Sequence, residues 1–149
     1  MSSLPMILVL HGPNLDRLGR REPELYGDKS LKDVNAMIVD RAATLDVGVT
    51  MRQSNHEGQL IDWLYEAEDE GVEGVILNAA GFTHTSVALR DAIAAVNVPV
   101  IEVHLTNTAK REDFRQRSLI APVCTGTISG FGVNSYLLAL DAASRFEER

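Results

Sequence analysis

The sequence predicts a doubly wound α/β fold, with a parallel five-stranded sheet covered by helices on both faces. Short runs that are apolar throughout alternate along the chain with longer segments whose apolar residues recur at helical spacing. Strands without polar alternation are buried on both faces, and such strands joined through helices form parallel sheets. The chain has 149 residues and no repeat, linker or low-complexity segment. A single α/β domain over residues 1–149 is therefore expected.

Five apolar runs are predicted to be strands, because each has the length of a strand and is bounded by polar residues, glycine or proline. They are Met6–His11, Val49–Ser54, Gly74–Asn78, Pro99–His104 and Val123–Ile128. Right-handed crossovers between these strands favour a flavodoxin-like arrangement with strand order 2-1-3-4-5.

The first long helix is predicted to begin at a Ser30 cap and to run to about Asp46, with Gly48 as its stop. Its spacing places on one face Leu31, Val34, Ile38, Ala42 and Leu45. A pattern of this period is typical of a helix that packs one face on a sheet.

The later helices have weaker boundary signals. Ser54 and Glu57 have the spacing of a capping box, and Gly71 provides a stop, so a second helix is expected between them. The other predicted helices are Thr85–Val96, a short polar one around Lys110–Arg117, and a final one carrying Val133, Tyr136, Leu137 and Leu140.

The composition excludes several classes of partner. A net charge of −7 disfavours nucleic acid and anionic membrane surfaces. No apolar run approaches the roughly 18 residues that span a bilayer, and no signal-peptide pattern is recognisable near the first residues. Cys124, the lone cysteine, excludes an internal disulfide and is predicted to be a core residue of an apolar strand. A cytoplasmic location is expected.

Basic residues concentrate in two windows of this acidic chain. The first connection, His11 to Asp28, has about 18 residues where about 2–6 are usual, and it contains Arg17, Arg20 and Arg21. The second window contains Lys110, Arg111, Arg115 and Arg117. Clustered arginines suit a small anion, because guanidinium pairs bidentately with carboxylate or phosphate. Solvated charged faces are the alternative, which composition alone favours.

Titratable side chains gather at the predicted strand ends, where ligands of doubly wound folds bind. Each histidine belongs to the end of a different strand: His11 and His104 end the first and fourth strands, and His56 and His84 follow the second and third. Asn14, Asn78 and Glu102 are expected at the same edge, together with both basic windows. This convergence favours a functional site over four unrelated structural histidines.

Several chemistries find no support. The chain lacks the dinucleotide and P-loop glycine motifs, a nucleophile elbow and the acidic residues of a phosphoacceptor domain. Its lysines lie outside the predicted strands, which disfavours imine chemistry. Glu102 and His104 share one strand face, a spacing that allows joint metal ligation or a carboxylate that orients a histidine. The second interpretation is favoured because no metal-binding histidine motif accompanies the pair.

Tyr26 is a further candidate, and the residues alone leave its role open. A tyrosine becomes a usable base where a neighbouring arginine stabilises its phenolate form. Arg21 lies in the same connection and could fold over beside it. An exposed loop tyrosine without a function is the simpler alternative.

Four ordered motifs resemble the type II 3-dehydroquinate dehydratase family. They are GPNLDRLGRREPELYG (residues 12–27), NAAGFTHTSVALRDA (78–92), IEVHLTN (101–107) and REDFRQ (111–116), and the similarity covers nearly the whole chain. The family eliminates water in the anti sense from 3-dehydroquinate to give 3-dehydroshikimate, in the shikimate or quinate pathway. The resemblance thus implies a hydro-lyase that acts on a small carboxylate and uses neither metal nor cofactor.

The resemblance implies roles at the opening of the chain. Tyr26 matches the general base that removes a proton from the carbon beside the ketone. Arg21 matches the arginine that activates this tyrosine and helps a loop to close as a lid. Asn14 matches the residue that holds a water against the developing enolate.

Other matched positions lie later in the chain. His104 resembles the general acid that protonates the departing hydroxyl, with Glu102 orienting it and Asn78 beside it. Asp91 corresponds to an aspartate that reaches a neighbouring subunit's site, because the family forms trimers arranged into dodecamers. The remaining matches are the backbone amides of Leu105 and Thr106, for the substrate carboxylate, and the side chains of His84, Arg111 and Arg115, around the hydroxyls and the lid.

Two residues depart from the family pattern. His11 stands where asparagine is usual, and Ala80 stands where glycine is common. If the backbone at Ala80 has a positive φ, alanine costs about 1 kcal/mol or more there. A different class of function also stays open, namely a flavodoxin-like module that binds a small anion, or regulates, without chemistry. Such a binder has no need of Arg21 and Tyr26 beside Glu102 and His104.

Overall fold

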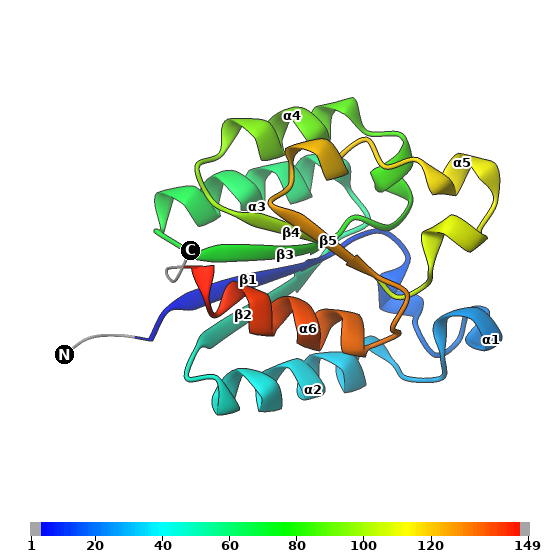
Figure 1. The fold of residues 1–149 in the computed structure, drawn as a ribbon, viewed down its shortest axis with the longest axis horizontal. Helices are drawn as coiled ribbons and strands as arrows, with labels where there is room; N and C mark the ends of the chain where they lie inside the picture. The colour runs from blue at the N-terminus through cyan, green and yellow to red at the C-terminus, as the bar shows by residue number, and fades with distance from the viewer. Residues whose placement is uncertain (1–3, 147–149) are drawn as a thin grey trace.

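The computed structural model describes residues 4–146 and has a parallel sheet of five strands in the order β2-β1-β3-β4-β5, which confirms the predicted topology (Figure 1). The strands are β1 (Met6–His11), β2 (Gly48–Gln53), β3 (Gly74–Asn78), β4 (Val100–His104) and β5 (Gly126–Ser129). All neighbouring pairs are parallel. The carboxyl ends of the strands therefore share one edge of the sheet.

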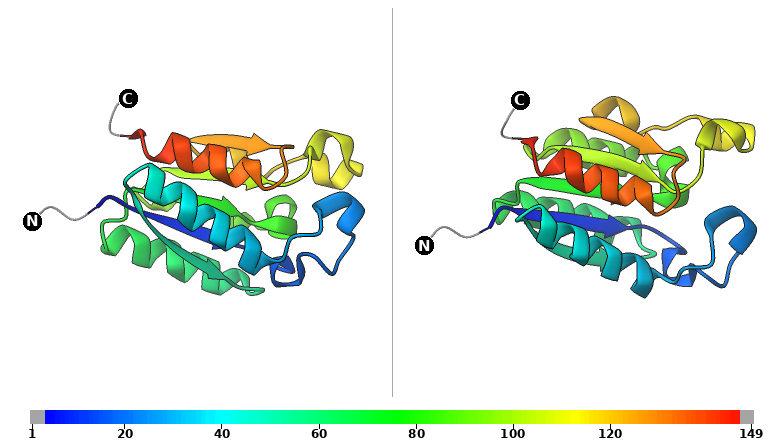
Figure 2. Two further views of the ribbon diagram at one scale, coloured as in Figure 1. Left: turned by 90° about the horizontal axis from the view of Figure 1, so that it is seen from below. Right: turned by 60° about the horizontal axis from the view of Figure 1, so that its bottom comes forward.

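Helices cover both faces of this sheet (Figures 1 and 2). One face carries α2 (Leu31–Thr44) and α6 (Asn134–Ala143), and the other carries α3 (Glu57–Asp69) and α4 (Val87–Ala95). The two short helices α1 (Pro23–Tyr26) and α5 (Asp113–Gln116) lie instead beyond the arrowheads of the strands. Further 3-10 turns are Leu15–Arg17, Ala80–His84, Thr108–Lys110 and Ala121–Val123.

The core is split by the sheet into two apolar clusters. Along β1, Ile7 and Val9 belong to the cluster under α2 and α6, whereas Leu8 and Leu10 belong to the cluster under α3 and α4. This alternation follows from the two-residue period of a strand. Because both faces are covered, the central strands are apolar at nearly every position.

The capping signal of α2 is confirmed, but its predicted stop is wrong. Ser30 and Asp33 form a capping box: the Ser30 amide donates to the Asp33 carboxylate at 3.0 Å, and the Asp33 amide donates to the Ser30 hydroxyl at 3.1 Å. The helix ends at Thr44, and Asp46 rather than Gly48 takes the left-handed conformation, with φ 56°. Gly48 is already the first residue of β2.

The capping box predicted at Ser54 does not form. Helix α3 begins at Glu57 with His56 as its N-cap, and the Ser54 hydroxyl accepts a bond from the His56 amide at 2.9 Å. The Glu57 carboxylate instead accepts a hydrogen bond from Ser86, the N-cap of α4. A tertiary partner therefore replaces the local one. Gly71, by contrast, is confirmed as the stop of α3, because it follows the C-cap Glu70 and has φ 72°.

Other predicted bounds were displaced near the carboxyl-terminal strands. The fifth strand spans Gly126–Ser129 and not Val123–Ile128, because Pro122 lies in a 3-10 turn that ends at Val123. Cys124 precedes the strand and is half-buried against the α3–α4 cluster. Burial and, to a smaller extent, the charge of Glu102 raise the pKa of its thiol to about 12. The short polar helix predicted around residues 110–117 is present as α5, which covers only Asp113–Gln116 and follows the Thr108–Lys110 turn.

Ala80 has the positive φ that was anticipated, 50°. Replacing it by glycine is expected to raise the free energy of unfolding by about 0.5–1 kcal/mol. The left-handed conformation costs alanine about 1–2 kcal/mol, and the freedom of glycine in the unfolded chain offsets part of the gain. Urea denaturation measures the change.

Ala79→Gly is the matched control for this substitution. Ala79 is fully buried and has an ordinary φ of −77°, so glycine there is expected to lower the free energy of unfolding. An Ala80→Gly variant no more stable than the parent protein would contradict the argument.

Candidate active site

The site is built at the carboxyl ends of β1, β3 and β4. Strand pairing sets His11 opposite Asn78 and Leu77 opposite Glu102. The Gly12 amide then donates a hydrogen bond of 2.7 Å to the Asn78 carbonyl. A Cβ at position 12 would lie 2.8 Å from that carbonyl oxygen and from the Ala79 carbonyl, so only glycine allows this approach.

A cavity of about 130 Å³ opens beyond these strand ends. Ten of the twelve site residues anticipated from the sequence line it: Asn14, Arg21, Tyr26, Asn78, His84, His104, Leu105, Thr106, Arg111 and Arg115. Glu102 lies behind His104, and Asp91 lies on an exposed face of α4 away from this cavity. The predicted convergence of loops and strand ends is thus observed.

His104 and Glu102 form a buried pair on β4. The Nε2 atom of His104 lies 2.5 Å from Oε2 of Glu102, and the two residues are only 8% and 3% exposed. The other carboxylate oxygen accepts a hydrogen bond of 2.9 Å from the Ser118 hydroxyl. Nε2 is thereby the donor to Glu102, which leaves Nδ1 of His104 for a ligand in the cavity.

Ser118 is a functional candidate that sequence reasoning missed. Its hydroxyl also accepts the backbone amides of Ile120 and Ala121, at 3.2 and 2.9 Å, and so starts the 3-10 turn before β5. These bonds fix the hydroxyl while it donates to Glu102. A serine in an irregular loop carries no motif, and it lies 16 residues from its partner.

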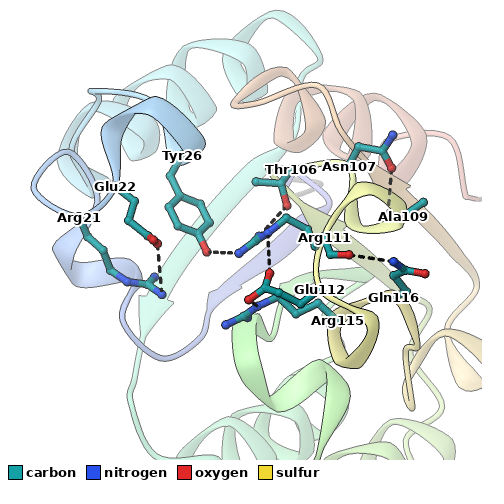
Figure 3. Close-up of polar contacts among 10 residues, drawn as sticks. All are labelled: Arg21, Glu22, Tyr26, Thr106, Asn107, Ala109, Arg111, Glu112, Arg115 and Gln116. Carbon is teal, nitrogen blue, oxygen red and sulfur yellow. Dashed lines mark hydrogen bonds and ion pairs between the residues drawn. The ribbon is translucent and has the colours of Figure 1, made fainter.

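The first connection and the second basic window meet at Tyr26 (Figure 3). Arg111 donates from Nη2 to the Tyr26 hydroxyl at 3.1 Å and from Nη1 to the Thr106 hydroxyl at 3.1 Å. The guanidinium carbon of Arg21 lies 5.0 Å from the centroid of the Tyr26 ring, and its Nη2 is 4.0 Å from Glu22. Arg111 therefore holds the hydroxyl, and Arg21 contacts the face of the ring.

The start of this connection is anchored in the core. Leu15 and Leu18 are buried in the cluster under α2 and α6, a role that the sequence did not single out. Asn14 has φ 70°, and its amide donates to the Asn55 side chain at 2.9 Å. Left-handed backbone suits asparagine, and it turns the chain toward the cavity directly after β1.

Two of the four histidines line the cavity. The rings of His84 and His104 stack with centroids 6.4 Å apart, and Nδ1 of His84 donates to the Arg117 carbonyl at 2.8 Å. His56 is exposed at the start of α3, outside the cavity lining. His11 is fully buried under the strand end, where burial lowers the pKa of its imidazole to about 4.

The side chains offer acid–base groups and anion-binding groups in one place. Within residues 4–146, no three His, Cys, Asp or Glu side chains are grouped so that they could hold a metal ion. Over the same range, no helix combines the length and apolarity that crossing a membrane requires. The arrangement supports proton transfer on a small anionic ligand, because a phenol, an imidazole and arginines face one cavity.

A family model described as Dehydroquinase class II matches residues 5–144 of the chain. The chain belongs to the class II dehydroquinase family. A 3-dehydroquinate dehydratase of a Nostoc species is 58% identical over 134 residues, which are 90% of this chain and 90% of that protein. The enzyme of that name from Rhizobium johnstonii is 54% identical over 136 residues, which are 91% and 93% of the two chains.

Solved structures agree with this assignment. The crystal structure of a type II dehydroquinase from Butyrivibrio crossotus has a TM-score of 0.93 and 41% identity, over 96% of this chain and 99% of that chain. The resemblance stated from the motifs is thus confirmed, and the protein is an enzyme of the hydro-lyase class. This class II dehydroquinase keeps the flavodoxin-like topology anticipated from its apolar runs.

Buried His11 is expected to make this dehydroquinase less stable in acid. The pKa of His11 is about 4 in the folded protein and near 6.5 in the unfolded chain. Between these values the unfolded chain binds a proton that the folded protein does not. The free energy of unfolding therefore falls as the pH drops from about 6.5 to 4, by about 3 kcal/mol from this residue.

Urea denaturation at several pH values over this range measures the effect. His11→Asn lacks the titrating group, so its free energy of unfolding is expected to depend less steeply on pH. Equal slopes for the two proteins would contradict the assignment of the acid sensitivity to His11.

Proposed function

We propose that this enzyme performs the anti elimination of water from 3-dehydroquinate, giving 3-dehydroshikimate through an enolate. The observation that carries the proposal is the meeting of a guanidinium-held phenol, Tyr26, with the buried His104–Glu102 pair in one cavity. Elimination next to a ketone requires a base at one carbon and an acid at the departing hydroxyl, and these two groups supply both.

Tyr26 acts as the base, in its phenolate form. The phenolate oxygen takes the proton from the carbon beside the ketone, and the electron pair of that C–H bond moves into the enolate. Arg111 donates a hydrogen bond to this oxygen and the guanidinium of Arg21 lies over the ring, so two positive charges lie beside the group that receives the proton. Sequence reasoning assigned this activation to Arg21 alone, and the hydrogen bond adds Arg111 to it.

His104 acts as the acid. The enolate collapses, the bond from carbon to the hydroxyl breaks, and the departing oxygen takes a proton from Nδ1 of His104 to leave as water. Glu102 accepts the hydrogen bond from Nε2, which fixes the ring orientation and stabilises the imidazolium before transfer. Ser118 in turn fixes the carboxylate of Glu102.

Other cavity residues stabilise the anionic groups of the reacting molecule. Asn14 lines the cavity just after β1, and it would hold a water against the developing enolate oxygen. The backbone amides of Leu105 and Thr106 would bind the substrate carboxylate. The side chains of His84, Arg111 and Arg115 would contact the substrate hydroxyls and the loop that covers the cavity. Arg115 lies 3.2 Å from Glu112, so its guanidinium is held at the rim of the cavity.

The proposal includes a setting for the activity. The enzyme would act in the cytoplasm within the shikimate or quinate pathway, and it would use no metal or cofactor. A lone cysteine suits a reducing compartment. The alternative, a small-anion-binding or regulatory module without chemistry, is not favoured, because binding alone does not require the Tyr26–Arg111 and His104–Glu102 pairs.

A dodecamer built as a tetramer of trimers is also part of the proposal. Asp91 is exposed on α4 and does not line the cavity of its own chain. This position suits a residue that completes a neighbouring subunit's site. Light scattering measures the assembly, and a stable monomer would contradict the role of Asp91.

Purified protein is expected to convert 3-dehydroquinate to a product with the ultraviolet absorbance of a conjugated enone. The rate should be the same after dialysis against EDTA, and borohydride added with substrate should not inactivate the enzyme. No rise in absorbance at micromolar enzyme would refute the proposed reaction. Inactivation by borohydride would indicate an imine and a different mechanism.

Variants at the phenol and its arginines separate their roles. Tyr26→Phe is expected to lower kcat by about 10²–10⁴-fold, which is the usual contribution of a general base. Arg111→Ala should lose more of kcat than Arg21→Ala, because only Arg111 bonds to the hydroxyl. Steady-state kinetics measure all three variants.

Arg20→Ala is the matched control for these substitutions. Arg20 is exposed in the same connection and does not line the cavity, so its loss should leave kcat within about twofold. A Tyr26→Phe enzyme with the kcat of the parent protein would remove Tyr26 from the mechanism.

A further inference from the structure

A hydrogen-bonded chain of four polar side chains, three of them buried, runs from helix α2 to the floor of the cavity. The imidazole of His11 lies 2.8 Å from the Asn35 side-chain oxygen through Nε2 and 2.9 Å from the Tyr136 hydroxyl through Nδ1. The Asn78 side-chain nitrogen lies 3.0 Å from the same hydroxyl. His11, Tyr136 and Asn78 are 0%, 1% and 3% exposed, so these groups depend on one another for hydrogen bonds.

A backbone amide determines which group donates and which accepts in each of these hydrogen bonds. The Ala80 amide donates to Oδ1 of Asn78 at 3.1 Å, which makes Nδ2 the atom that faces Tyr136. Nδ2 can only donate, so the Tyr136 oxygen accepts from Asn78 and its own hydrogen is directed to Nδ1 of His11. His11 then carries its proton on Nε2 and donates to Asn35. Each of the four hydrogen bonds thus joins one donor to one acceptor.

The opposite direction is not compatible with the same contacts. It would need Asn78 to turn its oxygen toward Tyr136 and its nitrogen toward the Ala80 amide, which places two donors face to face. A doubly protonated His11 does not fit these contacts either. The Tyr136 hydroxyl would then lie between two donors, Nδ1 of His11 and Nδ2 of Asn78, and its own hydrogen would have no acceptor. Burial lowers the pKa of His11 to about 4, which keeps it neutral near pH 7.

The Asn78 end of this hydrogen-bonded chain reaches the cavity. Asn78 lines it beside His104, and the chain uses one of the two N–H groups on Nδ2. The other N–H is available to an oxygen of the bound ligand. The orientation of the amide therefore decides whether the cavity is offered a donor or an acceptor at this point.

We propose that His11 is a positioning residue for the reaction, which through Tyr136 fixes the amide of Asn78 so that it presents an N–H group to the substrate. The proposal rests on the proposed function, because it assigns Asn78 a substrate oxygen. His11 itself is buried, does not line the cavity and touches no reacting atom.

Four variants test this assignment by steady-state kinetics on 3-dehydroquinate. His11→Leu removes the acceptor and Tyr136→Phe removes the hydroxyl, and each is expected to lower kcat/KM about tenfold, the usual effect of one lost hydrogen bond. The double variant should lose no more than the worse single variant, since both act through one chain. His11→Asn should keep kcat/KM within about threefold, because its Oδ1 branches from Cγ as Nδ1 does in histidine and can still accept from Tyr136.

A core variant controls for loss of stability alone. Ile38→Val lies in the same apolar cluster as Tyr136 and should lower the melting temperature without changing kcat/KM. If His11→Leu and Tyr136→Phe keep the kcat/KM of the parent protein, or if their losses multiply in the double variant, the positioning role is overturned.

A second measurement is independent of activity. Nitrogen NMR of protein labelled in histidine is expected to show His11 protonated on Nε2 and unprotonated on Nδ1 near pH 7. The reverse tautomer would overturn the direction of the chain whether or not the enzyme turns over 3-dehydroquinate. Parent protein that fails to turn over 3-dehydroquinate but has the expected tautomer would refute the proposed function and leave the hydrogen-bond chain intact.

Discussion

The hydrogen bond from the Gly12 amide to the Asn78 carbonyl joins the ends of the two central strands at 2.7 Å, and the rest of the site depends on it. It continues the pairing of β1 with β3 one residue beyond the strands and brings the chain against Ala79. From that point one segment turns at Asn14 and the other at Ala80, both in left-handed conformations. Backbone hydrogen bonds thus fix the ends of β1 and β3 under the cavity. The side chains there are not needed for that purpose and can make polar contacts.

The polar groups of the site fall into two sets with different supports. His104, Glu102 and Ser118 are fixed by strand β4 and by the turn before β5; the His104–Glu102 bond is buried and the Ser118–Glu102 bond is partly buried. Tyr26 is held by the side chains of Arg111 and Arg21, and Arg21 is partly exposed to solvent. Buried charge must keep its partners, because an unpaired carboxylate is costly in a low dielectric. The contacts of Tyr26 can break and reform at much smaller cost.

Much of this arrangement could be predicted from the sequence, and the misses have physical causes. The apolar runs determine the sheet, and the sheet determines that His104, Asn78 and Asn14 share an edge. The contact of Arg111 with Tyr26 joins residues 85 positions apart, and composition does not distinguish this arginine from Arg21. His11 lies at a strand end like His104, but its ring is hydrogen-bonded to Tyr136 and Asn35. Both partners are distant in sequence, so no local pattern predicts these contacts.

The conformation of Gly19 has a consequence for how the first connection is built. A Cβ there would lie 3.0 Å from the Asp28 carbonyl, so the two ends of the Gly19–Asp28 segment touch each other. Such a segment is an Ω-loop, closed at its neck, and Tyr26 within it contacts Arg111 and the apolar cluster under α2 and α6. Arg21 and Tyr26 lie within this segment and line the cavity. Changes of length or sequence inside the neck can therefore alter the mouth of the cavity without displacing β1 or α2.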